Sequence, residues 1–85
     1  MKRVVILETQ EGDWVGMYVD RILIYQGHVL GNGDLLYIIK MAEKYKFTSN
    51  DITLKELCNE DEKIVNESGR LPGLLDELIC SYDHN

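Results

Sequence analysis

Three short apolar segments open the chain. Residues 3–9 (RVVILET) form a β-branched run, residues 14–20 (WVGMYVD) alternate, and residues 21–29 (RILIYQGHV) form a third run. The connections QEGD and DR are typical of turns, so the pattern predicts an antiparallel three-stranded meander with a two-residue second hairpin. Arg21 stands where that hairpin favours glycine, at a cost of about 1 kcal/mol.

Both faces of this predicted sheet are apolar. If Val19 faces Ile22 across the hairpin, Met17 lies opposite Ile24. An antiparallel sheet with one solvated face alternates apolar and polar positions, so each face here needs a cover from a helix, the C-terminal segment or another chain. The predicted aliphatic face carries Val4, Ile6, Met17, Val19, Ile22 and Ile24, and the predicted aromatic face carries Val5, Leu7, Trp14, Tyr18, Leu23 and Tyr25.

Two helices are predicted from apolar spacing. Residues 34–47 (DLLYIIKMAEKYKF) suit a helix that covers the aliphatic face, and residues 73–82 (GLLDELICSY) suit a last amphipathic helix. Residues 83–85 form a predicted frayed tail. The stripe of the first helix is Leu35, Ile38, Ile39, Ala42 and Tyr45.

Residues 51–58 (DITLKELC) fit two structures. As a strand they place Ile52, Leu54 and Glu56 on one side, whereas Thr53 and Glu56 also match a helix capping box. We favour a strand over 52–57 followed by an acidic helix near 60–67. A right-handed crossover makes that strand parallel to the third strand and places it beside the first. The expected fold is a single α+β domain over residues 1–85, with a three- or four-stranded, mainly antiparallel sheet and a helix on one face.

Charge is concentrated in the C-terminal part. The first 50 residues are neutral overall, and the net charge of −6 lies in residues 51–85. This disfavours direct binding to nucleic acid or anionic membranes and favours a partner with a basic surface, although an acidic face also simply keeps a chain in solution. The predicted acidic surface comprises Glu60, Asp61, Glu62, Asp76 and Glu77.

The chain has no apolar run of membrane-spanning length, and its first residues lack a signal-peptide pattern, so we expect a cytoplasmic location. In that compartment Cys58 and Cys80 are expected as free thiols, with a disulfide as the alternative. The acidic clusters lack the spacing of a calcium-binding loop. No metal or cofactor is expected.

The segment GHVLGNGDLL (27–36) is the most site-like stretch. Its glycines could cradle a phosphate at a helix N-terminus, but Asp34 would occupy or repel the anion, and no lysine follows at P-loop spacing. A connecting loop explains it better. His28 with Asp34 could form a general base, but no nucleophile accompanies them. His28, Asn32 and Asp34 are therefore only a minor polar-site candidate, and no catalytic residue is assigned.

The stretches EGDWVGMYVD, GH and GRLPGLLDEL resemble a family of short proteins of bacteria and their phages that has no assigned activity. The family pattern has glycine where this chain has Arg21. The resemblance implies a bacterial or phage origin and a cytoplasmic location, and transfers no functional residue.

Three functions are compatible with these features. The first is a non-enzymatic protein-binding or regulatory module that acts as a homodimer or through a partner interface. The second is an acidic, phage-derived inhibitor of a nucleic-acid-binding protein, and the third is a small enzyme centred on His28. We favour the protein-binding module, because both faces of the predicted sheet are apolar and no set of catalytic residues is visible in the sequence. Its candidate interface residues are Trp14, Tyr18, Leu23 and Tyr25.

Overall fold

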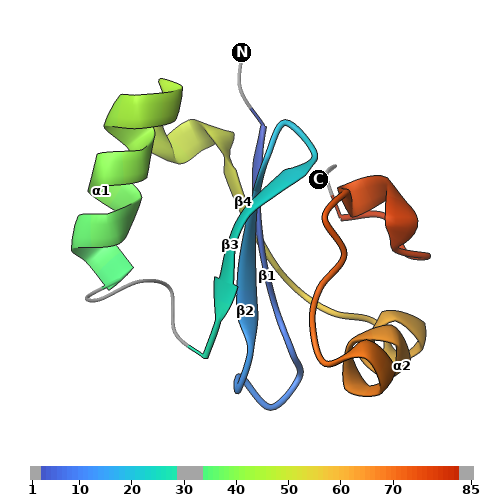
Figure 1. Ribbon diagram of the computed structural model, residues 1–85. Helices are drawn as coiled ribbons and strands as arrows, with labels where there is room; N and C mark the ends of the chain where they lie inside the picture. The colour runs from blue at the N-terminus through green and yellow to red at the C-terminus, as the bar shows by residue number, and fades with distance from the viewer. Residues whose placement is uncertain (1–2, 29–33, 83–85) are drawn as a thin grey trace.

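A four-stranded sheet lies between two helical layers (Figure 1). The computed structural model describes residues 3–28 and 34–82. Helix α1 lies on one side of the sheet, and α2 lies on the other side with the C-terminal segment. The α+β fold predicted from the sequence is confirmed. Its elements are β1 (Val4–Glu8), β2 (Val15–Val19), β3 (Ile22–Gly27), α1 (Asp34–Tyr45), β4 (Ile52–Glu56) and α2 (Asn59–Ser68), with 3-10 turns at Ser49–Asp51 and Leu75–Glu77.

The second hairpin has the two-residue turn that the sequence predicts. Asp20 and Arg21 both take positive φ values, 50° and 72°, as a turn matching the twist of the two strands requires. The predicted pairing of β1 with β2 is also confirmed, since Ile6 lies opposite Met17. The turn sequence and the alternation of β2 were therefore sufficient to place the first three strands.

The predicted register of β2 and β3 is wrong on one side of a β-bulge. The pairing shifts between Met17 and Tyr18, so Met17 lies opposite Tyr25 instead of Ile24. The extra residue turns Tyr25 onto the aliphatic face, where its ring lies 5.1 Å from that of Tyr37 in α1. The prediction that Tyr25 belongs to the aromatic face is wrong, because a bulge changes the face of every residue beyond it.

The fourth strand is present, which resolves residues 51–58 in favour of the strand. Strand β4 runs parallel to β1 and lies at the edge of the sheet, in the order β3-β2-β1-β4. Helix α1 makes the crossover from β3 to β4, and α2 confirms the acidic helix predicted near residues 60–67.

Helix α1 covers the aliphatic face with a stripe that matches the predicted one in part, since Ile38, Ala42 and Tyr45 pack on the sheet as expected. Tyr37 and Met41 pack on the sheet, whereas Leu35 and Ile39 are exposed. The helix ends at Tyr45, and the following residue, Lys46, has a φ of 63° and donates its backbone N–H to the Ala42 carbonyl. Tyr37 and Met41 thus take the places predicted for Leu35 and Ile39, and the helix leaves apolar side chains on its outer surface. The core of this layer contains Val4, Ile6, Met17, Val19 and Phe47.

The aromatic face is covered by α2 and by residues 71–82. Tyr18 is fully buried there, and its hydroxyl donates to the Pro72 carbonyl at 2.6 Å. The predicted helix over 73–82 is wrong, because this segment forms only the 3-10 turn at Leu75–Glu77. The core of this layer contains Val5, Leu7, Tyr18, Leu57, Val65, Leu71, Leu75, Leu78 and Tyr82.

The backbone of that segment bonds to groups outside it. Leu23 N–H donates to the Gly73 carbonyl and Leu75 N–H to the Arg21 carbonyl, both at 2.9 Å. These bonds tie the segment to the edge of β3. A helix over 73–82 would need the N–H groups of Ile79 and Cys80 for its own i to i−4 bonds, but both donate to the Asp61 carboxylate.

The cysteines form a disulfide between Cys58, at the start of α2, and Cys80, so the prediction of free thiols is wrong. The prediction came from the expected compartment, whereas the pairing follows from two segments that close on the same sheet face. None of the helices formed by residues 3–28 and 34–82 has the length and apolar character needed to cross a membrane.

Candidate functional site

Asp61 is a buried structural group and not part of the acidic surface predicted for it. Its carboxylate accepts the N–H groups of Ile79 at 2.8 Å and Cys80 at 3.0 Å, and the Tyr82 hydroxyl at 2.6 Å. A buried carboxylate needs such donors to offset its lost hydration. Asp61 therefore holds the C-terminal segment against α2.

Two tyrosines, Tyr82 and Tyr18, are buried on the same face of the sheet as this carboxylate. Burial raises the pKa of Tyr82 well above its ordinary value, and the hydrogen bond to Asp61 adds to the increase. Burial likewise raises the pKa of Tyr18, with Glu77 the next cause. Both hydroxyls act as donors, Tyr82 to Asp61 and Tyr18 to the Pro72 carbonyl.

The other acidic residues lie outside this core, and two of them have partners. Glu62 accepts the backbone N–H of Gln10 at 3.1 Å, and Asp76 forms an ion pair with Arg21. Glu60 and Glu77 are exposed. Because Asp61 is buried and Asp76 is paired, the five acidic residues do not present one continuous row of uncompensated charge.

His28 lies beside Trp14 and not in a catalytic arrangement. The two rings are 4.9 Å apart edge to face, and His28 Nδ1 lies 3.0 Å from the Asp13 carbonyl oxygen. They line a small pocket of about 190 Å³ with Thr9, whose hydroxyl donates to the Asp13 carboxylate at 2.5 Å. The Thr9 hydroxyl also accepts hydrogen bonds from the backbone N–H groups of Asp13 and Trp14. Its role is therefore to stabilise the turn between β1 and β2. Asn32 and the side chain of Asp34 lie outside the described residues.

The predicted interface residues on the aromatic face pack inside one chain. Tyr18 is fully buried, and Trp14 and Leu23 pack against the core under α2 and residues 71–82. The Trp14 indole N–H donates to the Gln26 side chain at 3.0 Å. Of the covers that the sequence left open for this face, those observed belong to the same chain, namely α2 and residues 71–82.

The open edge of the sheet is β4. On the opposite edge, Arg21 and Leu23 of the β3 hairpin bond to residues 73–75. Strand β4 bonds to β1 along one side, and among the described residues no strand covers its other side. Leu54, at the centre of β4, has 71% of its surface exposed.

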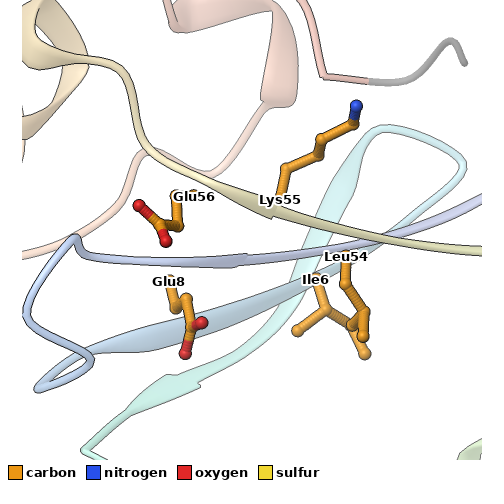
Figure 2. Close-up of a pocket in the computed structure, with 5 residues that line it drawn as sticks. All are labelled: Ile6, Glu8, Leu54, Lys55 and Glu56. Carbon is orange, nitrogen blue, oxygen red and sulfur yellow. The ribbon is translucent and has the colours of Figure 1, made fainter.

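An open groove of about 340 Å³ runs along β1 and β4 (Figure 2). Ile6 and Leu54 are paired in the ladder and point to the same side of the sheet, and Glu8 points to that side as well. Lys55 also lines the groove, but its side chain extends to the opposite side of the sheet. The groove therefore combines an apolar floor with the carboxylates of Glu8 and Glu56 at one end.

The predicted site did not include this groove. The alternation of Ile52, Leu54 and Glu56 on one side of a strand was visible in the sequence. Whether this alternation produces a groove depends on β4 being an edge strand and on how far α1 extends over β1. Both are properties of the tertiary structure. An exposed leucine between polar neighbours is no signal on its own.

Comparison with known proteins adds no relative: no family model matches the chain, and no curated protein or solved structure is significantly similar to it.

Proposed function

We propose that this chain is a small non-enzymatic protein-binding module that takes up an extended segment of a partner protein at the outer edge of β4. The observation that carries the proposal is Leu54, a large apolar residue exposed at the centre of an edge strand and flanked by a groove. Natural edge strands are normally shortened, covered or blocked, because an open edge invites pairing. Here the first residues of the β3 edge bond to residues 73–75, whereas among the described residues no strand pairs with the outer side of β4.

The backbone of β4 supports this mode of binding. Leu57 N–H donates to the Glu8 carbonyl at 2.9 Å, so the odd-numbered residues of β4 direct their backbone groups toward β1. In a strand the intervening residues direct theirs the other way. Leu54 and Glu56 thus present N–H and C=O groups outward, where an added strand can bond to them.

The side chains add selectivity to these main-chain bonds. An added strand places every second side chain on the groove side of the sheet, over Ile6 and Leu54. Covering Leu54 removes apolar surface from water, which favours a partner segment with an apolar residue at that position.

A matched pair of variants tests the proposal. Leu54→Lys places a charge on the binding edge, and Ile79→Lys makes the same kind of change at a residue exposed to 69% elsewhere. Peptides selected from a random displayed library against the wild-type protein should lose about tenfold or more in affinity for Leu54→Lys, and should bind Ile79→Lys normally. A library that yields no binder, or binders indifferent to Leu54→Lys, would refute the proposal.

A further inference from the structure

At one end of the groove, two carboxylates, those of Glu8 and Glu56, belong to directly paired residues. These residues are the last pair of the β1–β4 ladder and belong to the groove face. Neighbouring strands are about 4.8 Å apart, and like charges directly opposite one another destabilise a sheet. The pairing therefore carries a cost unless a cation lies nearby.

No cation from residues 3–28 and 34–82 pairs with either carboxylate. The side chains of Glu8 and Glu56 make no ion pair or hydrogen bond there, and the neighbouring Lys55 points to the other side of the sheet (Figure 2). Within the described part of the chain, the two carboxylates therefore form an uncompensated double negative charge at the end of an apolar groove, beside an open strand edge.

We infer that the partner segment carries an arginine or lysine whose side chain lies in this groove, with its cationic head between Glu8 and Glu56. This inference rests on the proposed function and names the chemistry of the partner. The aliphatic stem of such a residue packs on Ile6 and Leu54 while its head bonds to the carboxylates. The partner motif is then a basic residue opposite Glu56 and an apolar residue two positions away, opposite Leu54.

A second copy of this chain is a poorer occupant of the same edge. In a two-fold antiparallel pairing of β4 with itself, even-numbered residues meet even-numbered ones, so Glu56 meets Ile52, Leu54 or its own equivalent. The basic residue of β4, Lys55, lies on the opposite face. Self-pairing through β4 would leave both carboxylates without a cation.

Two synthetic peptides test the inference. In the first, threonine alternates with valine and arginine takes the central valine position, and in the second glutamine replaces the arginine. Affinities for the wild-type protein are measured by NMR titration. The arginine peptide should bind about tenfold more tightly, with an advantage that shrinks as salt is added.

The double variant Glu8→Gln/Glu56→Gln should abolish this difference, whereas Glu67→Gln, a matched change at an exposed position of α2, should preserve it. If both peptides perturb β4 and bind equally tightly, the inferred cation is wrong and edge binding stands. If neither peptide binds, or both perturb only residues away from β4, edge binding itself is refuted. Dimerisation of the wild-type protein that depends on Leu54 would assign the edge to a second copy and overturn the inference.

Discussion

Reduction of the Cys58–Cys80 disulfide should destabilise the fold strongly. The bond joins the start of α2 to the C-terminal segment across 22 residues of sequence. For a loop of this length, restricting the unfolded chain contributes about 3 kcal/mol to stability. The segment it holds carries Leu75, Leu78 and Tyr82, which cover the aromatic face of the sheet.

That contribution is large for a domain of this size. At about 0.05–0.15 kcal/mol per residue, a chain of 85 residues has a total stability of roughly 4–13 kcal/mol. A loss of about 3 kcal/mol lowers the melting temperature of such a domain by roughly 10–25 °C. Reduction is therefore expected to remove between about a quarter and three quarters of the total stability.

The assay is thermal unfolding followed by circular dichroism, with and without a thiol reductant. The double variant Cys58→Ser/Cys80→Ser should melt at the temperature of the reduced wild-type protein and should not respond to reductant. Alkylation under non-reducing conditions should find no reactive thiol in the folded wild-type protein. An unchanged melting temperature on reduction, or two reactive thiols before it, would refute this reasoning.

Three further predictions concern single residues. Asp61→Asn should cost about 2–3 kcal/mol in urea unfolding, because the N–H groups and hydroxyl that it accepts stay buried, while Glu77→Gln should change stability by less than about 0.5 kcal/mol. Lys46→Gly should stabilise by about 1 kcal/mol, since glycine takes the observed φ of 63° without strain, and a loss of stability would contradict this. Because burial raises the pKa of Tyr18 and Tyr82, the folded state retains protons that the unfolded state loses above the ordinary tyrosine pKa of 10.0. Stability should therefore fall as pH rises beyond that value, and an ultraviolet titration should show late tyrosinate formation coincident with unfolding; early, fully reversible titration of all tyrosines would contradict it.

The local pattern was enough to predict the first three strands and their order, and it favoured a strand over a helix for residues 52–57. Alternation over residues 14–20 and the DR turn placed β2 and β3, and the handedness of the crossover placed β4 beside β1. Each of these rests on side-chain period, turn chemistry or chain connectivity. These properties act between neighbouring segments and can be read from the chain itself.

The predictions that were wrong concern residues whose bonding partners are distant in the sequence. Residues 73–82 have helical spacing, but their backbone groups bond to β3 and to Asp61. The bulge that moves Tyr25 to the other face, and the pairing of Cys58 with Cys80, likewise depend on how whole layers meet. The candidate groove could not be predicted either, because an edge strand is defined by what does not pair with it.

Amide hydrogen exchange at β4 tests the central claim most directly. The amides of Thr53 and Lys55 point toward β1 and should be protected with or without a ligand, whereas those of Leu54 and Glu56 point outward and should exchange fast in the isolated protein. Adding the arginine peptide should slow exchange at Leu54 and Glu56, because an added strand bonds to these groups. Saturation with peptide that leaves both amides unprotected, or protects another part of the chain instead, would contradict binding at the β4 edge.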